Sequence, residues 1–510
     1  MNSRAFSTAA ALAALLAGAS CLPVFAQENA KAVEMRDSEA AYTKGDFKTA
    51  IAVLKILAAE GDALAQYRLG HMLAEGKGDE KNLPLAAEWL QKSADQGNHE
   101  ALTLLGRMYL EGAGVKQDQK KAATLLTRGA ELGNHQAQFY IGKMYRGGIG
   151  VEKNPAAAVP WLLSAAREEV VQAQYELGTI YATGDGATKD LAAAETWFLR
   201  AAGNGFIPAQ YTLAANYAQG NGFARDLGKA VEWYEKAAEG GLVKAQRELG
   251  GLYLTGIDDK PDYEKARKWL TTAADNDDPI AQTNLAFMFA SGTGVGKDDA
   301  VAAKWYEKAA QSGYIRAQTA LALFYETGRG VTKDNDKAAD WYRAAAAAGD
   351  EAAAARLGAM LVDGRVDPAT DENASRWIAD AAGNGLQTGY DWLETAAGEG
   401  RHEAQFHLAR LLVAGKGVDA DVGRAVNLLE TAADGGVSGA QLALAKRYAT
   451  GDGVTQNYVT AHKWANLAAI RGGREAIKMR ETFAKLMTPD QVAEAQKQAR
   501  EWVSRVRKSE

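Results

Sequence analysis

The sequence has 510 residues, 47% of them hydrophobic, with 9 prolines, one cysteine and a formal net charge of −6. The chain is longer than one ordinary domain core requires, yet no proline- or serine-rich linker divides it. A net charge of −6 provides no overall basic field to attract nucleic acid, so we exclude nucleic acid as a partner. A composition rich in Ala, Leu, Glu and Lys favours helix and excludes low-complexity disorder.

The first 26 residues resemble an export signal. Arg4 gives a short positive region, AALAALLAGA is an apolar stretch too short to span a bilayer, and residues 24–26 (VFA) form a small-x-small cleavage site. We expect cleavage near Ala26 and a mature chain that is periplasmic or secreted, without cysteine and without a transmembrane span. The alternative is a lipoprotein acylated at Cys21, which is disfavoured because Gly18 replaces the branched aliphatic residue usual at that position.

A helical hairpin is predicted over residues 27–60. Its turn, KGDF at residues 44–47 followed by Ala50, resembles the tight turn of a tetratricopeptide repeat. The resemblance implies that this hairpin caps the N-terminal end of the segment that follows.

From residue 61 to 385 the sequence repeats with a period of 36 residues. An alanine, nearly always followed by glutamine, marks each unit: Ala65, Ala101, Ala137, Ala173, Ala209, Ala245, Ala281, Ala317 and Ala353. Such a period is the signature of a solenoid, in which each unit stacks on its neighbours. In the unit marked by Ala209, helical spacing predicts helix A as far as Gln219 and helix B from Asp226 to Gly240.

Two further positions keep this period. Seventeen residues after each marker stands a residue that suits the N-cap of helix B: Asn82, Asp118, Asn154, Asp190, Asp226, Asp262, Asp298, Asp334, Thr370, Asp421 and Asn457. Ten tryptophans share one position on helix B: Trp89, Trp161, Trp197, Trp233, Trp269, Trp305, Trp341, Trp377, Trp392 and Trp464. We interpret the acidic residues as caps rather than catalytic groups, and the tryptophans as core.

A half-repeat interrupts the period at residues 386–400. After Ala353 the next marker is Ala404, so 21 residues are missing, and only Trp392 and the end of a helix B remain, without helix A and its loop. Because contacts in a solenoid are local, we expect the half-repeat to break the array into a long and a short arm. A tolerated deletion without function is the alternative. Two further repeats cover 401–473, and capping helices cover 474–510.

No catalytic or metal-binding set emerges from the sequence. His402 and His407 in HEAQFH are five residues apart, about 140° around a helix, so they do not share one metal ion. There is no G-x-S-x-G elbow and no S-x-x-K motif, and the G-x-G turns follow helices rather than strands. We therefore predict a protein that is not an enzyme and holds no metal or cofactor.

The repeated pattern A-Q-x-x-L-G-x-x-Y-x-x-G-x-G-V-x-x-D-x-x-x-A-x-x-W-x-x-x-A-A-x-x-G resembles the Sel1-like repeat, a relative of the tetratricopeptide repeat. It is clearest over residues 317–349, AQTALALFYETGRGVTKDNDKAADWYRAAAAAG. The resemblance implies an all-α fold, a right-handed α-solenoid of tandem helix-turn-helix Sel1-like, tetratricopeptide-like repeats. A final amphipathic helix from Thr488 also resembles bacterial members of this family.

The resemblance further implies a ligand-binding concave wall made by the A helices. Aromatic rings and cations on those helices would form a band suited to an acidic peptide or an anionic sugar chain. The predicted binding residues are Tyr67, His71, Arg107, Phe139, Lys143, Arg146, Tyr175 and Tyr211. The alternative is that the rings pack between neighbouring A helices and the cations are solvated.

Exported members of this family imply two functions. One is a non-catalytic periplasmic scaffold for protein partners, such as the periplasmic domain of a membrane sensor or the polysaccharide-export machinery. The other is a cell-envelope enzyme that acts on peptidoglycan precursors or β-lactams. The scaffold is favoured because this chain lacks the paired cysteines of the members linked to the second role.

Overall fold

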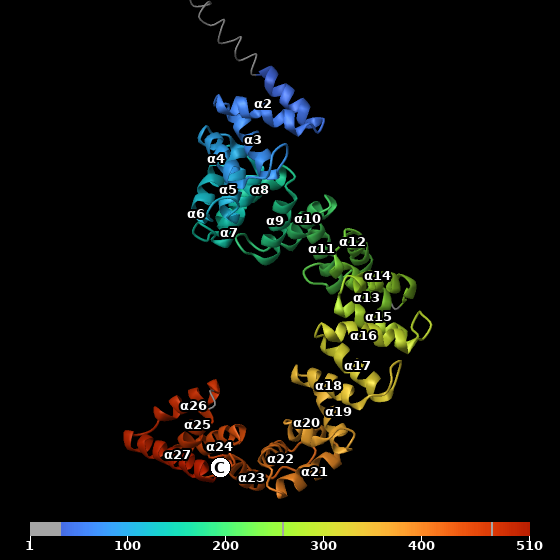
Figure 1. Ribbon diagram of the computed structural model, residues 1–510, viewed down its shortest axis with the longest axis vertical. Helices are drawn as coiled ribbons and strands as arrows, with labels where there is room; N and C mark the ends of the chain where they lie inside the picture. Colours follow the sequence, from blue (N-terminus) through green and yellow to red (C-terminus); the bar gives the residue numbers. More distant parts are fainter. Residues whose placement is uncertain (1–31, 258–259, 471–472, 510) are drawn as a thin grey trace, which may run out of the picture. The chain divides into compact units, whose positions relative to one another are not determined.

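The computed structural model describes residues 32–257, 260–470 and 473–509. These residues form helices joined by short turns, with no β-structure beyond an isolated bridge between Ile257 and Lys260. This confirms the all-α solenoid prediction. The chain forms two compact units, divided between Gln246 and Arg247, and Figure 1 labels the helices in chain order. The predicted leader, 1–26, lies outside the described residues.

The first unit starts with a hairpin made of a helix over residues 32–43 and α2 (Phe47–Ala59). Five repeats follow, in which each A helix packs on the B helices before and after it. The A helices are α3 (Ala63–Glu75), α5 (His99–Glu111), α7 (His135–Gly147), α9 (Val171–Thr183) and α11 (Ile207–Gln219). The B helices are α4 (Leu83–Asp95), α6 (Gln119–Glu131), α8 (Pro155–Arg167), α10 (Leu191–Gly203) and α12 (Leu227–Glu239).

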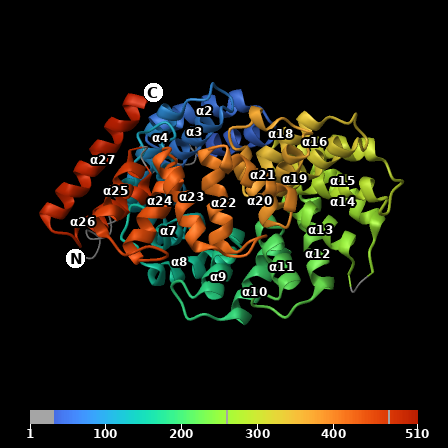
Figure 2. The same cartoon turned by 90° about the horizontal axis from the view of Figure 1, so that it is seen from below.

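Helix α13 (Val243–Thr255) contains the boundary between the units. The remaining A helices are α15 (Pro279–Ser291), α17 (Ile315–Thr327), α19 (Glu351–Val362), α22 (His402–Ala414) and α24 (Ser438–Thr450). The B helices are α14 (Tyr263–Asp275), α16 (Asp299–Gln311), α18 (Asn335–Ala347), α20 (Ala374–Gly383), α23 (Val422–Asp434) and α25 (Tyr458–Ala469). Single helices are η1 (Pro368–Thr370), α21 (Gln387–Gly398), α26 (Arg474–Ala484) and α27 (Pro489–Ser509), and α27 packs on α25 (Figure 2).

The alanine and glutamine that mark each repeat have a structural role. The alanine is buried at the contact with the preceding helix B, and the glutamine amide donates to a carbonyl at the end of that helix. In the unit marked by Ala317, Gln318 Nε2 lies 3.2 Å from the carbonyl oxygen of Ala310. The same bond, to the residue eight positions earlier, is made by Gln66, Gln138, Gln174, Gln210, Gln246, Gln282, Gln405 and Gln441.

Replacing Gln318 with leucine is expected to lower the free energy of unfolding by about 1 kcal/mol, because a buried helix-end carbonyl loses a donor while the volume is kept. The measurement is the urea midpoint, read by circular dichroism. Gln311 on α16 is exposed and serves as the control. A Gln311→Leu variant as unstable as Gln318→Leu would contradict the role of the hydrogen bond.

The predicted N-caps are confirmed at ten of the eleven positions. In each, the side-chain oxygen accepts from a backbone amide in the first turn of helix B, as Asp226 does from Lys229 at 2.9 Å. Thr370 is the exception, and that prediction was wrong. It lies in η1, and α20 begins after Asn373, because the loop before this helix B differs from those of the other repeats.

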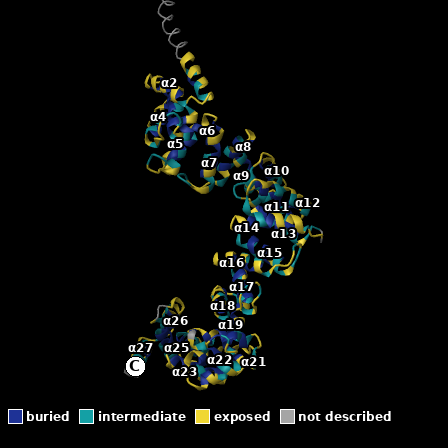
Figure 3. Cartoon of the chain, turned by 45° about the vertical axis from the view of Figure 1, so that its right-hand side comes forward, coloured by how far each residue is buried: buried dark blue, intermediate teal, exposed yellow. Residues whose placement is uncertain are grey.

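The tryptophan position is only partly core. Trp269, Trp377 and Trp464 are buried, whereas the other seven are half-buried. In several of these the outer side is covered by a cation, as where Lys92 Nζ lies 3.9 Å from the ring centroid of Trp89. The fully buried residue is the next one along helix B, which packs against helix A, as Leu162 does against Gly142. Figure 3 shows such buried residues within the helical layers.

The half-repeat is a single helix, α21, which begins with the pattern of a helix A and ends with that of a helix B. It begins like a helix A, because the buried Gly389 stands at the marker position 36 residues after Ala353. It ends like a helix B, because the carbonyl of Ala397 accepts from Gln405. The expectation of a helix B remnant alone was therefore incomplete.

The core is also not interrupted at the half-repeat. One buried apolar cluster runs from Ala322 to Ala499 and includes Leu393 of α21. The compact units divide between Gln246 and Arg247 and not at the half-repeat, and the expected break of the array into two arms stays a prediction. With one helix missing from the series, α20 contacts α22 as well as α19 and α21.

Candidate interaction site

The predicted binding residues of the first unit lie on its A helices, but the structure brings only some of them together. Tyr67 and His71 of α3 are neighbours, with ring centroids 6.0 Å apart. With Tyr42 and Arg68 they line a small hollow of about 190 Å³. On α5, the Arg107 guanidinium carbon lies 5.4 Å from the ring centroid of Tyr140.

Four other predicted residues pack between helices. Phe139 is buried, Tyr175 packs on Phe198 and Phe206, and Tyr211 packs on Tyr234. Arg146 forms ion pairs with Glu176 and Asp185 of the next repeat. Such buried or paired side chains hold neighbouring helices together, so the predicted continuous band of rings and cations does not form.

The cationic remainder of the band follows one register, since His71, Arg107 and Lys143 stand six residues after their marker alanines. Lys143 is exposed, whereas His71 and Arg107 are half-buried and lie near Glu75 and Glu111 of their own helices. Carrying the same register past the half-repeat leads to Arg410 and Lys446, both exposed. The sequence interpretation missed these two because it applied the register only to the first repeats.

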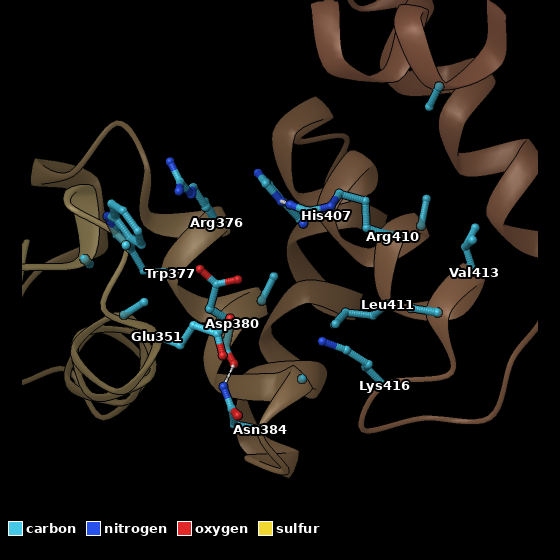
Figure 4. A pocket seen from close by; sticks show the side chains of 18 of the residues that line it. Glu351, Arg376, Trp377, Asp380, Asn384, His407, Arg410, Leu411, Val413 and Lys416 are labelled. Atoms are coloured by element: carbon cyan, nitrogen blue, oxygen red, sulfur yellow. Dashed lines mark hydrogen bonds between the residues drawn. The ribbon is translucent and has the colours of Figure 1, made fainter. Parts of the chain in front are cut away.

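The second unit contains a larger hollow, of about 630 Å³, beside the half-repeat. It is lined by the first turn of α19, by residues of α20, α22 and α24, and by one residue each of α18 and α23. Figure 4 shows Arg376 and Asp380 of α20 on one side, and His407 and Arg410 of α22 on the other. The α22 loop adds Lys416.

Three cations at this hollow have no ion-pair partner among the described residues: Arg376, Arg410 and Lys416. All three are exposed. Asp380 is half-buried between them without a direct ion pair in the described part of the chain, and burial raises its pKa although Arg410 and Arg376 act in the opposite direction. A fourth cation, Arg447, is buried and donates to Asp452 at 2.9 Å.

His407 lines the hollow and is buried. Burial, followed by the charges of Arg410 and Arg376, lowers its pKa to about 3, so the ring is neutral at physiological pH. Its Nδ1 lies 3.3 Å from Nη1 of Arg410, which identifies Nδ1 as the acceptor. Among the described residues, no three His, Cys, Asp or Glu side chains are grouped as metal ligands.

Acidification is expected to destabilise the second unit through His407. Between pH 6.5 and about 3 the unfolded chain binds a proton that the folded ring does not, so stability falls as pH falls. From pH 7 to pH 5 this contributes about 2 kcal/mol. A His407→Leu variant should lose that contribution in urea titrations at the two pH values, and His99→Leu, at an exposed histidine, should keep it. Parallel pH profiles for wild type and His407→Leu would contradict the assignment.

Comparison with known proteins identifies the repeat. The Sel1 repeat model matches ten segments: residues 63–98, 99–134, 135–169, 171–206, 207–242, 243–278, 279–314, 315–350, 402–437 and 438–473. The segment between the eighth and ninth matches, residues 351–401, contains the half-repeat and supplies the α19 and α20 sides of the larger hollow.

Solved structures and one curated protein share this similarity. A protective antigen present in uropathogenic Escherichia coli strains, displaying an SLR fold, is 32% identical with a TM-score of 0.60, over 89% of this chain and 94% of that one. A Sel1 repeat protein from Oxalobacter formigenes is 32% identical with a TM-score of 0.48, over 60% and 90%. A putative Sel1-like repeat-containing protein of Acanthamoeba polyphaga mimivirus is 45% identical over 49 residues, which span 10% of this chain and only 8% of that relative. No helix in the described residues is long and apolar enough to cross a membrane.

Proposed function

The chain belongs to the Sel1 repeat family, and on this premise we propose that it is a non-catalytic periplasmic scaffold that binds protein partners. Sel1 repeat proteins generally mediate protein–protein interactions. One observation carries the proposal for this chain. The repeats use their recurrent polar residues as helix caps and as ties between helices, as Asp226 and Gln318 do. They leave free to vary a register on the A helices that is exposed at Lys143, Arg410 and Lys446.

The periplasmic location is supported by the leader-like sequence of residues 1–26. The resemblance to exported relatives supports two kinds of partner, the periplasmic domain of a membrane protein or a component of polysaccharide-export machinery. Fractionation of cells that produce the C-terminally tagged full chain tests the location. The proposal expects the protein in the periplasmic fraction, shortened near Ala26, and an uncleaved cytoplasmic protein would overturn this part of it.

Binding is tested by affinity capture of the tagged protein from the cell envelope, followed by mass spectrometry. We expect a defined protein partner whose recovery falls when Arg107 and Lys143, or Arg376 and Arg410, are replaced by glutamine. Matched replacement of exposed B-helix cations, Arg267→Gln with Lys304→Gln, should leave recovery unchanged. If all variants recover the partner equally, binding through the A-helix register and through the larger hollow is contradicted.

The enzymatic alternative has a direct assay. The purified protein should leave a chromogenic β-lactam and a lipid-linked peptidoglycan precursor unchanged. Turnover of either compound by the purified chain would replace the scaffold proposal with an envelope enzyme.

A further inference from the structure

We propose that the hollow beside the half-repeat binds an acidic segment of a protein partner, with Arg376, Arg410 and Lys416 holding its carboxylate groups and Asp380 accepting a backbone N–H. The proposal rests on the scaffold function only in taking the occupant to be a protein. It assigns the binding chemistry to one place in the second unit.

The two arginines are held in position to bind carboxylate. The guanidinium carbon of Arg376 lies 4.6 Å from the ring centroid of Trp377, and that of Arg410 lies 5.9 Å from Phe406. A ring beneath a guanidinium restricts its motion, and its N–H groups can donate two parallel hydrogen bonds to a carboxylate. Nη1 of Arg410 also donates to His407, which further fixes that side chain and leaves Nε and Nη2 for a ligand. They come from α20 and α22, so a carboxylate between them would contact both helices (Figure 4).

The arrangement of the charges in the hollow favours an anion. Among the charged residues that line it, Asp350 is engaged as the N-cap of α19 and Arg447 is paired with Asp452. The remaining set is Arg376, Arg410, Lys416, Glu351 and Asp380. The Asp350 carboxylate keeps its charge, so three acids balance the three cations, but its oxygens already accept from the first-turn amides of α19 and from the Thr319 hydroxyl. The three cations are exposed and make no ion pair in the described part of the chain, so they are available to ligand carboxylates.

The other lining residues favour a peptide over a sugar chain. Leu411, Val413 and Leu429 line the hollow, and Val413 is 38% exposed. The volume of the hollow lies within the range of roughly 300–1,000 Å³ found for small-ligand sites. A few side chains of a ligand can therefore fit in it. Apolar walls beside cations suit a segment in which an aliphatic residue adjoins an acidic one. Asp380, which has no ion pair in the described part of the chain, is placed to accept the segment's backbone N–H.

The hollow lies where the repeat pattern is interrupted. In a regular repeat each helix contacts mainly the helices directly before and after it, whereas here α20 also contacts α22, the second helix along the series. Arg376 and Asp380 lie in residues 351–401, between the matched Sel1 repeats. The missing 21 residues thus explain how Arg376 on α20 comes to lie across the hollow from Arg410 on α22, the second helix after it.

The test is a fluorescence-anisotropy titration of the full mature chain with a labelled Gly-Leu-Glu-Glu-Gly-Gly peptide and its Gly-Leu-Gln-Gln-Gly-Gly counterpart. We expect the glutamate peptide to bind at least about tenfold more tightly than the glutamine peptide, and more weakly as salt rises. Replacing both arginines, Arg376→Gln with Arg410→Gln, should cost at least about tenfold in affinity, and Arg267→Gln with Lys304→Gln less than about twofold. Arg376→Lys with Arg410→Lys, which keeps the charge but not the two-point geometry, should give an intermediate loss if each variant keeps the wild-type circular dichroism spectrum.

Three results would overturn the proposal. They are equal binding of the two peptides, equal loss from the hollow and control variants, and a uronic-acid oligosaccharide that binds through the same arginines more tightly than the peptide. Envelope capture separates this inference from the scaffold proposal. If the Arg376→Gln, Arg410→Gln variant recovers a partner as well as wild type does, the hollow is not the binding site but the scaffold proposal stands. If the peptide binds but no partner is recovered, the hollow's binding chemistry stands and the scaffold proposal is contradicted.

Discussion

Replacing Gly150 with alanine is expected to lower the free energy of unfolding by about 3 kcal/mol. Gly150 has φ +69°, and a Cβ placed there would lie 2.1 Å from the carbonyl oxygen of Gln119 at the start of α6. The left-handed backbone alone costs an alanine about 1–2 kcal/mol, and forcing two packed segments apart costs about 1–3 kcal/mol more. The loop between α7 and α8 would therefore separate from the preceding repeat.

The matched control is Gly133→Ala. Gly133 has φ +88°, but no heavy atom lies within 4 Å of the Cβ position, so only the backbone cost of about 1–2 kcal/mol is expected. A repeat array does not unfold in one step, so the measurements are the urea midpoint and amide hydrogen exchange in α6 to α8. Equal effects of the two substitutions would show that the close approach of the loop to α6 is not what requires glycine at Gly150.

Replacing Arg343 with methionine is expected to destabilise the second unit by about 2–3 kcal/mol. Arg343 Nε lies 3.0 Å from a carboxylate oxygen of Asp371, whose side chain is only 2% exposed. Removing the cation leaves a buried charge uncompensated, which costs about 3–5 kcal/mol in fully buried pairs and less here, because Arg343 is 35% exposed. The effect should reach the hollow, since Asp371 precedes α20.

The double variant Arg343→Met, Asp371→Asn is the control for this prediction. It removes the unpaired charge and retains an acceptor for the backbone N–H of Asn373, which Asp371 now receives at 2.9 Å. Urea denaturation should show most of the lost stability restored. A double variant as unstable as the single one would show that Arg343 acts through packing and not through its charge.

Local helix rules explain what the sequence predicted well. Asp226 is recognisable as an N-cap because it precedes a helical run and must satisfy amides a few residues away. Which of two neighbouring helix positions is buried depends on tertiary contacts and not on local rules. Trp233 and Tyr234 are adjacent on α12, and only the contact with helix A determines that Tyr234 is buried and Trp233 half-buried. For the same reason the sequence left open whether Phe139 faces solvent or packs between helices.

The candidate site was harder to predict because its contacts join distant positions. The ion-pair partners of Arg146, Glu176 and Asp185, are 30 and 39 residues away, so pairing depends on how repeats stack. Arg410 could have been predicted from the sequence by extending one register past the half-repeat. Arg376 was not, because a helix B residue faces the hollow only through the direct contact of α20 with α22.

Site-specific photo-crosslinking in intact cells tests most directly that a protein partner occupies the hollow. A photoreactive residue would replace Asn384, which is exposed and lines the hollow, and in a second strain Glu264, which is exposed on α14. The account predicts an adduct from position 384 whose crosslinked peptide contains Asp or Glu, and which is lost when Arg376 and Arg410 become glutamine. An adduct equally strong from position 264, or one from position 384 that survives loss of both arginines, would contradict it.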